Sequence, residues 1–177
     1  MWYYRYSLII FGGEKVVVYH GSSVLVIDPI ILKSDRKLDF GEGFYTTFNK
    51  EQAVRWSERV ADRDKTKTRI ITEYNFDMTA AEKEISIIKF ENPDVVWLDF
   101  VCANRLGRES AKNYDIAIGP VANDSVYQTI LFYEQNVYDK DEAIKRLKIQ
   151  ELYNQVLFHT EKSLCYCQYI RHEIIEV

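Results

Sequence analysis

The chain has 177 residues, of which 47% are hydrophobic and 28% charged, and these fractions exclude wholesale disorder and any collagen-like or low-complexity class. Lys and Arg together number 23 against 27 Asp and Glu, so the net charge is −4. This balance argues against a broad nucleic-acid-binding face, because such binding draws its affinity from neutralising phosphates. The length predicts one compact domain over residues 1–177.

Cysteine usage and apolar runs predict the setting of the protein. Cys102, Cys165 and Cys167 are too few for a disulfide framework, which favours a reducing, cytoplasmic location. Cys165 and Cys167 lack the spacing of a zinc half-site, so we expect no metal. The apolar runs fall far short of the ~20 residues of a membrane helix, and the N-terminus shows no signal-peptide cleavage pattern. We therefore expect no contact with a membrane.

The first expected elements surround two glycine-rich turns. A β-branched run predicts a strand over residues 15–20, and Gly12-Gly13 before it favours a hairpin with residues 5–11. A short aromatic strand is expected directly after Gly41 and Gly43, where the backbone bends sharply.

A helix is predicted next, with Asn49 as its N-cap and Gln52 completing a capping box. We expect Ala53, Trp56 and Val60 to form its inner face.

The rest of the chain alternates irregularly between strands and helices. Helices are predicted after Asn92-Pro93, Asn123-Asp124 and Asp139, and strands over residues 70–76, 85–90, 114–120, 155–160 and 168–177. The sum is about seven strands and four helices. Because strands do not alternate strictly with helices, we predict an α+β fold with a mixed, mainly antiparallel sheet and peripheral helices.

Two motifs combine polar residues with strand ends. His20 closes an apolar strand and is followed by Gly21 and Ser22, a small pair that lets a ligand approach the backbone; a purely structural histidine is the alternative. After Gly43, Phe44 and Tyr45 offer a stacking surface for a flat ring, or else form a packed hairpin. Successive strand residues point to opposite faces, so at most one of these two rings serves a given pocket.

Two further candidates lie later in the chain. Gln155 leads directly into an apolar strand, although one glutamine carries little information by itself. Asp115 and residues 119–124 mark a strand end before a helix, a place where ligands commonly bind. Simple capping by Asn123 or Asp124 explains the same residues equally well. The GxGxxG and GxxxxGK[ST] fingerprints are absent from the sequence, which sets aside a Rossmann dinucleotide site and a Walker phosphate loop.

Several spaced segments together resemble one family. They are Tyr19-His20-Gly21-Ser22, Asp39 to Thr47, Gln52 to Trp56, Trp97 to Arg105, Tyr114 to Asp124 and Asn154 to Lys162. This pattern resembles a bacterial family of domains of unknown function, number 3990, over about residues 16–170. Residues 1–15 lie outside it, as an N-terminal extension or an extra strand.

That family is in turn similar to the ADP-ribosyltransferases of the diphtheria-toxin and poly-ADP-ribose-polymerase branch, which split NAD at the nicotinamide bond. His20-Gly21, Tyr45 and Gln155 occupy, in order, the places of that branch's His-Gly, Tyr and Glu, Asp or Gln signature. The resemblance implies a split sheet of the ADP-ribosyltransferase type, with NAD as substrate and no metal.

The resemblance also implies roles for these residues. His20 would hold ribose hydroxyls, the Gly21 backbone would grip the nicotinamide carboxamide, and Tyr45 would stack on the nicotinamide ring. Ser22, Gly43 and Phe44 complete the expected NAD-binding residues.

Gln155 departs from the most active form of this signature. A carboxylate would oppose the oxocarbenium-like charge that develops as nicotinamide leaves, whereas glutamine accepts a hydrogen bond without bringing charge. Three outcomes follow: a weak transferase, a site completed by another carboxylate such as Asp124 or Glu161, or a fold that has lost its chemistry. We count Gln155, Tyr45 and Asp124 as the catalytic candidates.

The leading hypothesis is an NAD-dependent mono-ADP-ribosyltransferase with an unknown macromolecular acceptor, such as a toxin–antitoxin effector with a small antitoxin-like partner. A catalytically silent module that binds a nucleotide or a protein is the alternative. A nuclease that uses His20 with Asp39 or Asp124 as acid and base is a third reading. Arg105 either serves the ligand or pairs with a carboxylate such as Asp115.

Overall fold

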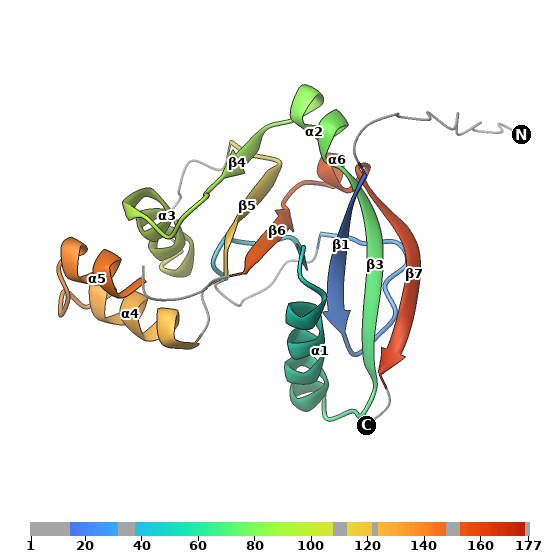
Figure 1. The fold of residues 1–177 in the computed structure, drawn as a ribbon, viewed down its shortest axis with the longest axis horizontal. Helices are drawn as coiled ribbons and strands as arrows, with labels where there is room; N and C mark the ends of the chain where they lie inside the picture. The colour runs from blue at the N-terminus through green and yellow to red at the C-terminus, as the bar shows by residue number, and fades with distance from the viewer. Residues whose placement is uncertain (1–14, 32–37, 108–112, 122–123, 148–152, 176–177) are drawn as a thin grey trace, which may run out of the picture.

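The computed structural model describes residues 15–31, 38–107, 113–121, 124–147 and 153–175. These residues form a compact α+β fold with one seven-stranded sheet and six helices (Figure 1). The expected fold class is confirmed. The expected strand over residues 5–11, with its hairpin, and Asn123 lie outside the described residues.

The sheet is mixed and mainly antiparallel, as the sequence predicts. Its order is β4-β5-β6-β2-β1-β3-β7, and β4–β5 is its parallel pair. The strands are β1 (Lys15–Ser22), β2 (Phe44–Thr47), β3 (Arg69–Asp77), β4 (Ile87–Lys89), β5 (Ile116–Pro120), β6 (Asn154–Phe158) and β7 (Cys167–Ile175).

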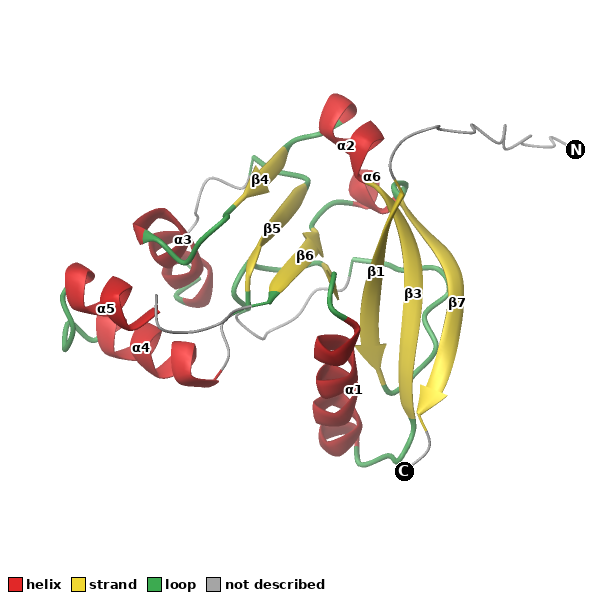
Figure 2. Cartoon of the chain, in the orientation of Figure 1, coloured by secondary structure: helices red, strands yellow, loops and turns green. Residues whose placement is uncertain are grey.

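The helices lie in two groups. Beside β4, β5 and β6 are α3, α4 and α5, whereas α1 lies beside β1 and β3 (Figures 1 and 2). Their bounds are α1 (Lys50–Asp64), α2 (Met78–Glu84), α3 (Val95–Arg105), α4 (Asp124–Glu134), α5 (Lys140–Leu147) and α6 (Glu161–Leu164).

The sheet is nearly divided between β1 and β2. Strand β1 pairs with β3 along its whole length, but with β2 it pairs at one position, Tyr19 opposite Thr47. The halves are β4-β5-β6-β2 and β1-β3-β7, and each strand within a half has a longer ladder with its neighbour than β1 has with β2. A core containing Val18, Phe44 and Phe158 spans the division on one face.

Helix α1 begins where the sequence predicts. The Asn49 side chain accepts a hydrogen bond from the Gln52 backbone N–H at 2.7 Å. The expected capping box is not completed, because the Asn49 N–H donates to the Thr47 hydroxyl and the Gln52 side chain accepts from Arg55.

The buried face of α1 differs from the expected one. Ala53, Ser57 and Ala61 are buried, whereas Trp56 and Val60 are half-buried at the margin. Gly21 is the reason: a Cβ there would lie 1.9 Å from the Ala53 carbonyl oxygen, so helix and strand approach closely. Only small residues fit between backbones at such a separation.

Short helices are the main elements that the sequence analysis missed. Helix α2 is capped by Asp77 and α6 by Thr160, and neither is long enough to show a helical period. Helix α3 begins two residues after Pro93, because Asp94 caps it by accepting from the Trp97 N–H at 3.0 Å. Within the described residues, no helix combines the length and apolar character that crossing a membrane requires.

We predict that Gly21→Ala destabilises the fold, because the added methyl group collides with the α1 backbone. The expected loss in free energy of unfolding is about 1–3 kcal/mol or more, measured by urea denaturation. Val17→Thr on the same strand, where the side chain is exposed, is the control and should change stability little. Equal stability of the two variants would contradict the close packing of β1 on α1.

Candidate functional site

His20 lies where β1 and β2 separate. Its Nδ1 is 2.7 Å from the Tyr45 carbonyl oxygen, and a carbonyl only accepts, so Nδ1 carries the proton and donates. Burial lowers the pKa of His20, although the Tyr45 hydrogen bond opposes this, which favours the neutral ring. The other nitrogen, Nε2, therefore presents a lone pair, and no partner for it occurs in the described parts of the chain.

The Phe44 ring packs against the His20 ring. The two ring centroids are 4.6 Å apart, and Phe44 also makes an edge contact with Tyr74 at 5.5 Å. Phe44 is buried in the core that spans the division of the sheet. It thus fixes the orientation of His20 rather than presenting an open stacking surface.

Tyr45 points to the opposite face of β2 and closes a turn. Its hydroxyl donates to the Gly41 carbonyl at 2.7 Å and accepts from the Phe40 N–H at 3.2 Å. Its half-buried ring packs on the core that includes residues of α3, α4 and α5. Burial and the charge of Asp39 raise the pKa of Tyr45 well above its usual value, so the phenol stays protonated.

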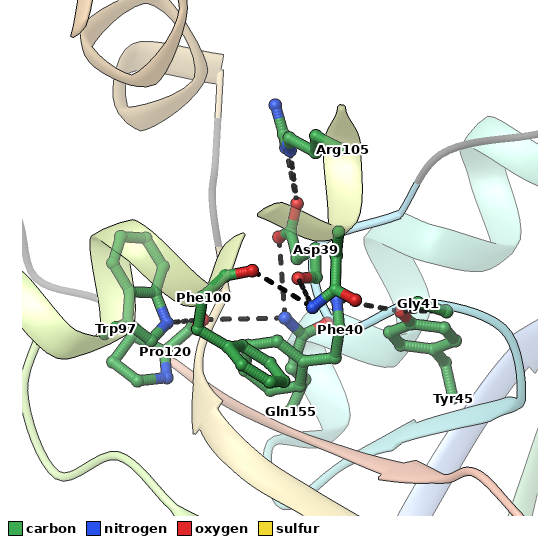
Figure 3. A network of polar contacts seen from close by, with 10 residues as sticks. Asp39, Phe40, Gly41, Tyr45, Trp97, Phe100, Arg105, Pro120 and Gln155 are labelled. Carbon is green, nitrogen blue, oxygen red and sulfur yellow. Dashed lines mark hydrogen bonds and ion pairs between the residues drawn. The ribbon is translucent and has the colours of Figure 1, made fainter. Parts of the chain in front are cut away.

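The turn at residues 39–41 is held by side chains from distant elements (Figure 3). Arg105 Nε donates to Asp39 Oδ1 at 2.8 Å, and Asn104 Nδ2 donates to the Asp39 carbonyl at 3.2 Å. The Tyr114 hydroxyl donates to the Phe40 carbonyl at 2.8 Å. Both partners of the ion pair are largely buried.

Of the two alternatives expected for Arg105, the structure shows pairing with a carboxylate, but the partner is Asp39 and not Asp115. Asp115, the carboxylate suggested by the sequence, instead accepts from the Thr160 hydroxyl at 2.8 Å and from the Ser86 N–H. Arg105 binds Asp39, a residue 66 positions away in the chain, which spacing could not indicate.

Gln155 lies beside Asp39 at the start of β6. Only 3% of Gln155 is exposed, and its Nε2 is 3.5 Å from both Asp39 Oδ2 and the Pro120 carbonyl oxygen. The Trp97 indole also donates to that carbonyl, at 3.2 Å (Figure 3). Gln155 Oε1 has no partner among the residues described here, so the amide offers an acceptor next to a carboxylate.

The strand pairings place the predicted residues on two faces. Thr47 lies opposite both Tyr19 and Gln155, so the side chains of these three residues are on one face of the sheet. Tyr45 is two residues before Thr47 on the same strand and therefore shares this face. His20 and Phe44 lie on the other face. The structure therefore brings Tyr45 and Gln155 to the turn at Asp39, and joins His20 to them through the Tyr45 backbone.

Other predicted residues shape the backbone. The Ser22 hydroxyl accepts from the Val24 N–H at 3.4 Å. Gly43 has φ +148° and lies against β6, where a Cβ would be 2.3 Å from the Phe158 carbonyl oxygen.

Asp124 begins α4, but its side chain lies outside the described residues. Glu161 is an exposed residue at the start of α6 and forms no hydrogen bond with Gln155 in the described structure.

Sequence reasoning considered Asp39 only for the nuclease reading and assigned no role to Asn104. Both lie inside the segments that carry the family resemblance, which was the available signal. Asp39 pairs with Arg105 and forms no hydrogen bond with His20 in the described structure, whereas the acid–base pair of a nuclease would require one. No group of three or more His, Cys, Asp or Glu side chains suited to a metal ion occurs within the described ranges.

Comparison with known proteins gives one match. A family described as Protein of unknown function (DUF3990) matches residues 16–169, close to the boundaries expected from the sequence. No curated protein and no solved structure matches the chain.

We predict that Arg105→Met lowers the free energy of unfolding by about 3 kcal/mol, because it leaves the largely buried Asp39 carboxylate without its cation. Adding Asp39→Asn should recover part of this loss. Lys140→Met breaks an exposed ion pair with Asp99 and should cost less than about 1 kcal/mol. Equal losses for Arg105→Met and Lys140→Met in chemical denaturation would refute a stabilising role for the buried pair.

Proposed function

We propose that this chain, which belongs to the DUF3990 family of proteins of unknown function, binds NAD where β1 and β2 separate and transfers its ADP-ribose group. The observation that carries the proposal is the acceptor nitrogen of His20 at this division of the sheet. Ribose hydroxyls are hydrogen-bond donors, and a neutral imidazole held by Tyr45 and Phe44 is a preorganised acceptor for them.

The backbone next to His20 supports the same site. Pairing of β1 with β2 is limited to Tyr19, so Gly21 and Ser22 form no ladder pair with β2. Backbone N–H and C=O groups at such an edge suit a carboxamide, which needs one donor and one acceptor. The Cα of Gly21 faces α1, so only its backbone edge can serve a ligand.

The chemistry we propose is slow cleavage of the ribose–nicotinamide bond. Nicotinamide leaves with the bonding electrons, C1′ becomes cationic, and an acceptor nucleophile then attacks C1′. Gln155 Oε1 can accept a hydroxyl hydrogen bond, and the nearby Asp39 carboxylate supplies negative charge that Arg105 partly offsets. The acceptor is an unidentified macromolecule, and a small antitoxin-like protein is the inhibitor that a toxin of this kind would need.

Because Arg105 offsets the charge of Asp39, the structure also favours a second candidate function, a catalytically silent module that binds NAD without splitting it. Gln155 is uncharged and Asp39 is ion-paired, so no unpaired carboxylate is available from these two residues to oppose a cation. Such a module would bind NAD with the same His20 contact but release no nicotinamide.

We predict that His20→Ala weakens NAD binding about tenfold, the cost of one hydrogen bond, in isothermal titration calorimetry with nicotinamide release followed in the same sample. His172→Ala, which replaces an exposed histidine on β7, is the control and should bind NAD normally.

The affinity of the wild type for NAD should be constant above about pH 6.5. It should decrease as the pH falls toward the lowered pKa of His20, because a protonated imidazole has no nitrogen that can accept a hydrogen bond.

The outcomes separate the candidates. NAD binding with release supports the transferase, and binding without release supports the silent module. Absence of NAD binding to the wild type would reject both, and equal binding by His20→Ala and wild type would remove His20 from the site.

We predict that Gln155→Glu increases nicotinamide release at least tenfold. The new carboxylate would lie close to Asp39, and like charges raise each other's pKa. The gain should therefore be small at low pH and grow as pH rises and residue 155 ionises. Gln168→Glu, the same change at an exposed position of β7, is the control. A pH-independent rate equal to that of Gln168→Glu would contradict a catalytic position for residue 155.

A further inference from the structure

Strand β7 forms one edge of the sheet and is long. It spans Cys167–Ile175, whereas β4 at the other edge spans only Ile87–Lys89. An edge strand presents unpaired backbone donors and acceptors, and short length is one of the ways in which proteins protect such edges. The β4 edge has this protection and the β7 edge does not.

In the described part of the chain, no strand pairs with the outer edge of β7, although α6 contacts this strand. Helix α1 packs on β1 and β3, and β7 pairs with β3. Ile170 is 45% exposed and Ile174 is 58% exposed, so this strand carries apolar as well as charged surface.

The exposed stretch of β7 is nearly palindromic in chemistry. Its sequence is Ile170-Arg171-His172-Glu173-Ile174, with an apolar residue at each end and opposite charges on either side of a central histidine. When the stretch is read in the reverse direction, a residue of opposite charge stands at each of the two charged positions. An antiparallel copy of the same strand therefore matches it.

We propose that two copies of this chain associate through antiparallel pairing of their β7 strands, with His172 opposite His172 of the partner subunit. Arg171 then faces Glu173 of the partner subunit, and Glu173 faces the partner's Arg171. Opposite charges facing each other across strands stabilise pairing, and like charges destabilise it. Two-fold symmetry gives each contact twice.

The charges select this register among the neighbouring ones. Moving the symmetry centre by one residue places Arg171 opposite the partner's Arg171, or Glu173 opposite the partner's Glu173. Both alternatives oppose like charges. The intramolecular ion pairs of Arg171 with Glu73, at 2.8 Å, and of Glu173 with Lys50, at 2.6 Å, already orient these side chains on the sheet.

A register shift limits how far the pairing extends. The β3–β7 ladder is irregular between Glu73 and Tyr74, which lie opposite Arg171 and Tyr169, so Ile170 occupies a bulge. Bulges bend an edge and terminate regular pairing. The proposed contact is therefore short, and the dimer should dissociate on dilution.

Charge reversal tests the register. Sedimentation equilibrium of the wild type should show mass rising with concentration from 20.9 kDa toward twice that value. Arg171→Glu and Glu173→Arg should each be monomeric over the same concentrations, because each opposes like charges. An equimolar mixture of the two should regain the dimer, because Glu and Arg then face each other at every charged pair.

The matched control is an exposed ion pair far from β7. Lys140→Glu and Asp99→Arg make the same changes in charge at the Lys140–Asp99 pair and should leave association unchanged. A wild type that stays monomeric at millimolar concentration overturns the proposal. Single variants that still dimerise, or folded single variants whose mixture stays monomeric, overturn the register.

Cross-linking gives a test that keeps both charges. In a Cys165→Ser background, which removes the exposed thiol, His172→Cys should form an intermolecular disulfide on mild oxidation, because facing residues on paired strands are within disulfide reach. Gln168→Cys in the same background should not, since the two copies of residue 168 lie at opposite ends of the pairing. Equal cross-linking of the two variants overturns the proposal, whatever the folding of the charge-reversal variants.

Discussion

The ion pair of Arg105 with Asp39 fixes the turn on which the candidate site depends. Within the described ranges, residues 39–41 make one hydrogen bond to another backbone group, from the Gly41 N–H to the Leu38 carbonyl at 3.2 Å. Side chains from α3, β2 and β6 and from Tyr114, just before β5, also hydrogen-bond to this turn. Because β2 begins three residues after this turn, the same contacts position Tyr45 and, through its carbonyl, the tautomer of His20.

The polar groups of the site are neutral or ion-paired near pH 7, which limits the chemistry that the site can perform. Burial lowers the pKa of His20 and raises that of Tyr45, so both groups are neutral near pH 7, while Arg105 offsets the charge of Asp39. Neutral donors and acceptors suit ribose hydroxyls and a carboxamide. A developing cation gains less from such a site, because its stabilisation requires unpaired negative charge. If NAD is the ligand, as we propose, the arrangement therefore suits its binding better than fast bond cleavage.

Local patterns predicted much of the fold but little of the polar network. The β-branched run before His20 and the alternation along residues 70–76 gave β1 and β3, and Asn49 gave the start of α1. The inner face of α1 was displaced because Gly21 draws the helix close to the strand. Alternation correctly separated Phe44 from Tyr45, yet the partner of Arg105 depends on tertiary contact across 66 residues. The order of His20, Tyr45 and Gln155 came from a family resemblance and did not reveal that His20 faces away from the other two.

The strands on one side of the site are joined more firmly than the two strands that meet at the division of the sheet. Strands β1, β3 and β7 are joined by long ladders and form one unit, whereas β1 meets β2 through the Tyr19–Thr47 pair and the His20–Tyr45 hydrogen bond. Apolar contacts of Val18, Phe44 and Phe158 close the division on the His20 face. A ligand that inserts beside His20 therefore has few lateral backbone bonds to displace. An association of two β7 strands would extend the rigid unit that carries His20 and would leave the connection to β2 as the compliant one.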